Sequence, residues 1–373
     1  MIRQWLVYAC GALLIGPGQA VWAETGTSAS DLGQEPAAPA AASVKDTTEI
    51  ADDIEARVQG CFETAEIAVV KIESEHRLGV LSGTGFFISP TGTIMTSASL
   101  AMDTQSITVS RGMERYPAEV VMIDPRSGIA LLEIEAGDDY LNPFGDVSVQ
   151  VGTPLLAIGY PLDFPVSPAF GLVAGFDKHF NERFLSTTHI RAAIPCQPGQ
   201  AGSPVLTLDG QLAGVLVTTI ANGAGCHILP IRAARKVYED YLRFGHVMHG
   251  WVGVTLEETS QPVRDSRARV VDLMQNTPAA ESGIRNGDTV IQVGDVRIGR
   301  PLDIVDASFF LTAGDQVAIQ VIREGEEHTF QVYPTYHPAL ALILPIGERP
   351  ILRALGFTLS LQDGPEKALA PMP

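Results

Sequence analysis

The run from Ile190 to Leu206 holds the residues whose types and spacing best suit the binding of a carbonyl or carboxylate oxygen by backbone N–H groups. Gly199 and Gly202 lie three residues apart in it, followed by a proline and an apolar segment typical of a strand. Glycine tolerates a left-handed backbone that aims successive N–H groups at one point. We expect the N–H groups of Gly199 and Ala201 to form an oxyanion-like pocket for a carbonyl or carboxylate oxygen.

Cysteine and histidine side chains form a second group of candidates. Cys196, Cys226, His227 and His189 are residue types that bind metal ions. The chain contains no Cys-x-x-Cys or His-Glu-x-x-His spacing to support such a site, and we expect no cofactor. A metal- or redox-binding scaffold stays an alternative, and so does the interpretation that both cysteines are small buried apolar residues.

Composition and charge bound the class of protein. The chain has 373 residues, 46% hydrophobic and 18% charged, which is typical of globular domains and long enough for two of them. A formal net charge of −18 argues against nucleic acid or an anionic membrane surface as a standing partner.

The N-terminus is typical of an export signal. Arg3 supplies a positive charge, residues 5–15 are apolar, and Val21-Trp22-Ala23 ends on small residues. We expect residues 1–23 to be a signal peptide cleaved after Ala23, and the mature protein to be periplasmic. An uncleaved signal acting as an anchor is the alternative.

The remaining chain divides by pattern. Residues 24–60 are predicted to be a low-complexity linker with a short helix from Thr47 to Val58. Many short apolar strands separated by turn residues fill 61–246, which predicts a β-barrel or sandwich that ends in a helix over Ile231–Phe244. A second unit spans 247–335, and the tail 336–373 is left unassigned.

The landmarks of residues 62–335 together resemble the HtrA/Deg family, which implies a mainly β fold: a chymotrypsin-like double β-barrel followed by one PDZ domain. The resemblance rests on Gly83–Thr96, Asp124–Ile134, Pro154–Leu162, and the run Gly199-Gln-Ala-Gly-Ser-Pro204.

Carried onto this chain, the family's catalytic histidine, aspartate and serine fall on Ser99, Gly128 and Ala201. The chemistry needs a nucleophilic oxygen, a base within hydrogen-bond reach and a group that orients the base. None of the three residues can fill its role. The resemblance therefore implies a pseudoprotease, a serine endopeptidase homologue without activity.

A relocated active site is the enzymatic alternative. Ser203 replaces the last glycine of the family's motif and would be the nucleophile, with His179 or His189 as base. The other interpretation is a small residue tolerated in a turn.

The second unit resembles the family's PDZ domain. Gly250-Trp-Val-Gly-Val254 matches its carboxylate-binding loop, so Trp251, Val252, Gly253 and Val254 are the expected peptide-binding residues. A PDZ fold used only for packing or assembly is the alternative.

The resemblance has three further implications. It places Cys196 and Cys226 beside the same specificity pocket, where a disulfide between them would close the pocket's base. It implies a homo-oligomer, a trimer formed through the protease domain. It also implies that the chain binds polypeptides or peptide C-termini as a chaperone, scaffold or regulator, with an active relative as one candidate partner.

Overall fold

The computed structural model describes residues 47–136, 139–145, 147–180, 183–220, 223–336 and 357–360. The predicted signal peptide and the first part of the predicted linker lie outside these residues. Within the described part, every helix is too short or too polar to cross a membrane.

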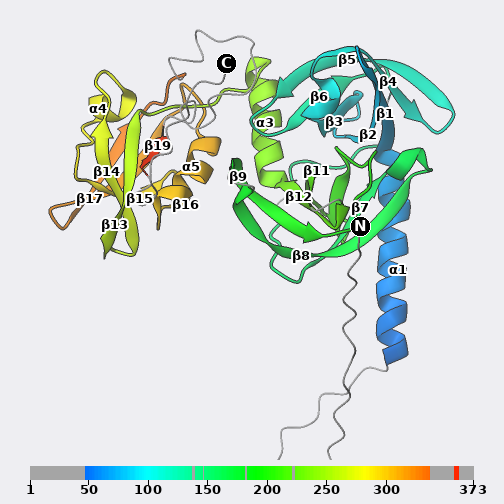
Figure 1. Cartoon of the computed structure of the whole chain (residues 1–373), viewed down its shortest axis with the longest axis horizontal. Helices are drawn as coiled ribbons and strands as arrows, with labels where there is room; N and C mark the ends of the chain where they lie inside the picture. Colours follow the sequence, from blue (N-terminus) through cyan, green and yellow to red (C-terminus); the bar gives the residue numbers. More distant parts are fainter. Residues whose placement is uncertain are drawn as a thin grey trace, which may run out of the picture. The chain divides into compact units, whose positions relative to one another are not determined.

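A long helix, α1 (Thr47–Ala65), leads into the first barrel (Figure 1). The sequence predicted its start but ended it at Val58. The helix continues because Cys61 and Ala65 pack into the main hydrophobic core, and burial of its last turn stabilises helix beyond the local signals. A 3₁₀ turn, η1 (Glu66–Ala68), joins it to the first strand.

Six antiparallel strands close the first barrel in the order β1-β2-β3-β6-β5-β4. A single helical turn, α2 (Ala98–Ala101), follows the third strand, and the Ser97 side chain caps it by accepting from the Ser99 N–H. The strands are β1 (Val69–His76), β2 (Gly79–Phe87), β3 (Thr93–Ser97), β4 (Thr104–Arg111), β5 (Glu114–Asp124) and β6 (Ile129–Glu133).

Six more strands close a second barrel in the order β10-β11-β12-β9-β8-β7. The predicted double barrel is therefore confirmed. The strands are β7 (Pro154–Gly159), β8 (Ser167–Phe180), β9 (Arg183–Ala193), β10 (Pro204–Thr207), β11 (Leu212–Ile220) and β12 (Gly225–Pro230), with a 3₁₀ turn η2 (Pro161–Asp163). Apolar side chains from both barrels and α1 meet in one core, among them Phe86, Leu131, Leu156 and Leu229.

The helix α3 (Ile231–Phe244) has the bounds predicted from its apolar spacing. Ile231, Ala234 and Val237 are buried on one face, and Gly245 ends the helix in the left-handed conformation with φ +74°. A short connection then enters the second unit.

The PDZ unit is built on one sheet in the order β18-β17-β15-β14-β13-β19. Residues 301–310 form a 3₁₀ turn followed by a short helix. The elements are β13 (Val254–Val263), β14 (Ser266–Leu273), α4 (Pro278–Ser282), β15 (Thr289–Val293), β16 (Val296–Arg297), η4 (Pro301–Asp303), α5 (Ile304–Phe310), β17 (Val317–Arg323) and β18 (Glu326–Val332).

The tail, left unassigned from the sequence, contributes one strand. β19 (Phe357–Ser360) pairs in parallel with β13 at the edge of the PDZ sheet (Figure 1). Its sequence neighbours on both sides lie outside the described residues.

Candidate functional site

The structure brings Ser99 and Gly128, two of the three triad positions predicted from the resemblance, together through the backbone. Ser99 lies on α2, and the N–H of its neighbour Ala98 donates to the carbonyl oxygen of Gly128 at 2.8 Å. Gly128 is half-buried with φ +78°, at the turn between β5 and β6. Thus the turn after β3 and the turn before β6 meet where the family's histidine and aspartate would lie.

The third position lies against the same turn. The Thr84 N–H donates to the carbonyl oxygen of Ala201 at 2.9 Å, which ties the loop to β2. A Cβ added to Gly202 would lie 2.2 Å from the Thr84 carbonyl oxygen and 2.8 Å from the Ser97 nitrogen. Gly202 also has φ +87°, so only glycine fits this close approach without strain.

Ser99, Gly128 and Ala201, here called the triad positions, differ from the histidine, aspartate and serine that the resemblance would place there. The exposed Ser99 hydroxyl lies 2.9 Å from the Ser97 hydroxyl, and neither alcohol can act as a base near neutral pH. Gly128 carries no side chain and Ala201 carries a methyl group. Gly199 keeps φ +96°, and the predicted oxyanion role of the Gly199 and Ala201 N–H groups stays a prediction.

Ser203, the alternative nucleophile, lies inside the second barrel. Its side chain is fully buried, and among the described residues its Oγ has no hydrogen-bond partner. His189 directs Nδ1 to the Thr187 carbonyl oxygen at 2.8 Å instead. A nucleophile needs a base and access to substrate, and the structure provides neither at Ser203.

The candidate metal-binding residues point to opposite sides of the barrel wall. Cys226 and Cys196 pack in the interior of the second barrel. His227 follows Cys226 on the same strand and so faces the other way, with Nε2 2.9 Å from the Asp177 carboxylate. In the described part of the chain, no group of three or more His, Cys, Asp or Glu side chains is arranged to hold a metal ion.

Cys196 and Cys226 are both buried thiols in the structure. A hydrogen bond to Cys196, together with burial, raises the pKa of the Cys226 thiol, and the same contact lowers the pKa of Cys196. The predicted disulfide stays a prediction, which alkylation of the exported protein with and without reductant would test.

The predicted carboxylate loop of the PDZ unit is partly engaged by the chain itself. The Trp251 N–H donates to the Thr335 carbonyl oxygen at 2.7 Å, and the Thr335 N–H returns a bond of 2.9 Å. The Trp251 backbone therefore serves the fold and is not available to a ligand. Gly253 has φ +83°, which bends the loop into β13 and leaves Val252 and Gly253 as the remaining candidate donors.

The helix α5 is fastened to the second barrel. Asp306 accepts hydrogen bonds from the Thr188 backbone N–H and hydroxyl and from the Thr187 hydroxyl, and it pairs with Lys178 at 2.9 Å. Burial opposes its ionisation, but the Thr188 bonds and the Lys178 charge hold the pKa of Asp306 below its usual value. Sequence reasoning missed this contact because nothing local marks Asp306.

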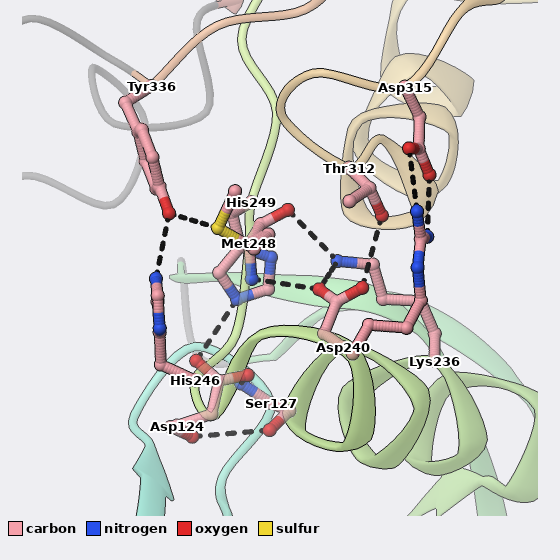
Figure 2. Close-up of polar contacts among 11 residues, drawn as sticks. Asp124, Ser127, Lys236, Asp240, His246, Met248, His249, Thr312, Asp315 and Tyr336 are labelled. Atoms are coloured by element: carbon pink, nitrogen blue, oxygen red, sulfur yellow. Dashed lines mark hydrogen bonds and ion pairs between the residues drawn. The ribbon is translucent and has the colours of Figure 1, made fainter.

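A second set of polar contacts joins α3, the connection and the PDZ unit (Figure 2). Asp240 on α3 pairs with Lys236 at 2.6 Å and accepts from the Met248 N–H at 2.8 Å and the Thr312 hydroxyl at 3.2 Å. Three groups therefore converge on one buried carboxylate, which links α3 to the connection and to the PDZ unit.

A third contact joins His249 to Asp124, which lies at the end of β5, four residues before Gly128. His249 lies 3.0 Å from the buried Asp124 carboxylate, which also accepts from the Ser127 N–H (Figure 2). Burial opposes ionisation of Asp124, but His249 and Ser127 hold its pKa below the usual range. The β5–β6 turn is therefore held by the PDZ unit.

Known family models match both units. The model described as "Trypsin-like peptidase domain" matches residues 83–215, and that described as "PDZ domain" matches residues 250–333. With the two closed six-stranded barrels, these matches define a chymotrypsin-like double barrel followed by a PDZ domain. Similarity to the HtrA/DegP family, which combines these two domains, is supported.

Curated relatives match about two thirds of the chain. "Probable periplasmic serine endoprotease DegP-like" of Pseudomonas fulva (strain 12-X) is 29% identical over 272 residues, covering 69% of this chain and 56% of the relative. The protein of the same name from Chlamydia pneumoniae is 27% identical over 260 residues, covering 65% and 53%. The chain spans about half the length of the curated relatives it matches.

Solved structures agree on the fold. "HtrA-type protease AlgW with tripeptide" has a TM-score of 0.63 at 18% identity and covers 74% of this chain and 96% of its own. The serine endoprotease from Yersinia pestis has a TM-score of 0.55 at 21% identity, covering 74% and 97%. At these identities the likeness shows the fold alone.

Proposed function

We propose that this protein is a proteolytically inactive HtrA-like protein that binds polypeptide through its PDZ domain. One observation carries the proposal: the backbone joins the turns that hold the triad positions, yet Ser99, Gly128 and Ala201 do not supply the base, orienting group and nucleophile at those places. Loss of the whole constellation costs about a million-fold in rate where this chemistry has been measured.

Peptide binding rests on a separate feature. The loop ending at Gly253 leads directly into β13, and a strand that borders such a loop binds an extended peptide by main-chain hydrogen bonds. The AlgW protease, which is similar to this chain in fold, was solved with a tripeptide. We propose the same type of ligand here. The protein would bind it in the role of a chaperone, a scaffold or a regulator of a partner.

Location and assembly follow from the relatives and the sequence. Relatives are named as periplasmic, and the first 23 residues are typical of an export signal, so we propose a periplasmic protein cleaved after Ala23. We propose a homotrimer by resemblance to the family. Light scattering of the purified protein tests the assembly, and N-terminal sequencing tests the cleavage.

Proteolysis is the first test. The full chain is incubated with a fluorescent unfolded casein and with a serine-directed phosphonate, beside the Ser203→Ala variant. We expect neither cleavage nor labelling from either protein. Cleavage that is present in the wild type and lost in Ser203→Ala would overturn the proposed inactivity. Cleavage that both proteins retain through further purification would overturn it as well, because a nucleophile other than Ser203 would then be active.

Peptide binding is the second test. An array of immobilised peptides with randomised last four residues is probed with the full chain, once with free carboxylates and once with C-terminal amides. We expect binding to a subset of the free carboxylates that is lost with the amides. Equal binding to both would contradict recognition of a peptide C-terminus.

A further inference from the structure

The strand that should receive a peptide already has a neighbour in this chain. β13 pairs with β14 on one side and with β19 on the other. The register places Val254 beside Phe357 and Glu257 beside Ser360. Without β19, β13 would be an open edge strand, with unpaired main-chain groups that another strand can bind.

The direction of β19 shows what kind of ligand it imitates. A peptide whose carboxylate sits in the loop before Val254 must run toward that loop, antiparallel to β13. β19 runs parallel to β13, and Ser360 lies well before the end of the chain at Pro373. β19 therefore occupies the edge as an internal extended segment and not as a C-terminus.

The segment is suited to this position by type and by surroundings. Phe357, Thr358 and Leu359 are residues with favourable or neutral strand preference, and Gly356 precedes them. β19 also lies against α5, the helix fastened to the second barrel through Asp306. An external strand added to β13 beside α5 would need the same space.

We propose that Phe357–Ser360 is a resident ligand of the PDZ edge, which a polypeptide from another protein must displace before it can bind. The proposal rests on the peptide-binding function proposed above and names its regulation. A tethered segment has an effective concentration on the order of millimolar when its tether is short. If the edge is free in about a tenth of the molecules, external affinity falls about tenfold.

Two substitutions in the full chain test this. Thr358→Pro with Leu359→Pro removes two adjacent N–H groups, and alternate residues of a strand direct N–H groups to the same side, so one of the two must face β13. The matched control, Thr358→Val with Leu359→Val, keeps both N–H groups and the strand preference.

Hydrogen–deuterium exchange measures the edge directly. We expect alternate amides of Val254–Glu257 to be protected in the wild type and the valine control, and to exchange at least about tenfold faster in the proline variant. Peptides from the array are expected to bind the proline variant about tenfold more tightly than the other two proteins.

The outcomes separate the two proposals. Equal exchange and equal peptide affinity in all three proteins would overturn the resident ligand. Faster exchange in the proline variant with no peptide bound by any protein would support the pairing of β19 with β13. It would overturn the proposed peptide-binding function. Equal exchange with tight peptide binding by all three would support that function and reject its regulation by the tail.

Discussion

The triad positions and the β13 edge differ in what their proposed functions need from side chains. Proteolysis needs three particular side chains, and the proposed inactivity rests on Ser99, Gly128 and Ala201 at their places, although the backbone contacts between these turns persist. The β13 edge recognises a partner through main-chain N–H and C=O groups, which every residue except proline supplies. Under the proposed function, side-chain substitution would remove activity from the first region and would leave the second able to bind.

The contacts between the two regions follow from the same difference. Asp124, His249 and Asp306 join the domains through buried side chains. A buried, hydrogen-bonded carboxylate that loses its partner is strongly destabilising. These contacts thus hold the PDZ unit and the connection against β9 and the β5–β6 turn, which is a structural role.

Restoring groups to the crevice is expected to give the largest effect. Ala201→Ser alone should leave cleavage at background, because no base lies within reach. Adding Ser99→His should raise the rate about 10²-fold, since loss of the aspartate alone costs about 10⁴ and loss of the whole triad about 10⁶ in serine proteases. Peptide turnover by the two variants measures this. A double variant as inactive as the single one would show that the backbone around the triad positions no longer supports this chemistry.

The close approach of the Gly202 loop to β2 is tested by substitution of Gly202. Gly202→Ala forces a Cβ to within 2.2 Å of the Thr84 carbonyl oxygen at φ +87°, so strain and overpacking together should lower the free energy of unfolding by about 4 kcal/mol. The control Gly210→Ala has φ +75° and open space around its Cβ, and should lose only about 1 kcal/mol. Urea unfolding measures both. Equal losses would mean that the close approach to β2 is not a constraint.

The free energy of unfolding should depend on pH through His189, which lies on β9. Burial lowers the pKa of His189 to about 4, against which the Thr187 carbonyl bond and the Asp306 and Asp177 charges act weakly. The pKa of His189 in the folded protein lies below its value of about 6.5 in the unfolded chain, so unfolding between these two pH values takes up a proton. The contribution of the neutral His189 to the free energy of unfolding is therefore fully present above pH 6.5 and is lost as the pH falls toward 4. The loss should reach about 3 kcal/mol.

Unfolding at pH 7 and pH 4 measures this loss in the wild type and in His189→Asn, which should lose that much less. His246→Asn, at an exposed site, is the control and should behave as the wild type does. An equal loss in all three proteins would show that His189 is not protonated on unfolding.

Local signals, which are apolar periods and turn residues, predicted α3 and a β-barrel or sandwich, and the double barrel was predicted from the family resemblance. These signals missed the β13–β14 hairpin because its turn is made by Arg264 and Asp265, which take φ +46° and +67° without the glycine or asparagine that usually marks such turns. Ser99, Gly128 and Ala201 were located by resemblance.

The contacts of Asp306 with β9 and of β19 with β13 connect residues far apart in the chain. No local pattern in the sequence encodes either pairing, so both emerge only from the folded structure.

The smallest expected effect on stability is in the PDZ loop, where it should be accompanied by loss of binding. Gly253→Ala places a Cβ 2.5 Å from the Thr277 side chain at φ +83°, and should cost about 2 kcal/mol. Gly287→Ala, in the same unit with φ +94° and open space, should cost about 1 kcal/mol and leave peptide affinity unchanged. Thermal unfolding and titration with the best array peptide measure both. If the two variants bind that peptide equally, recognition does not pass through the Gly253 loop, and the β13 edge must bind its partners along the strand alone, as it binds β19.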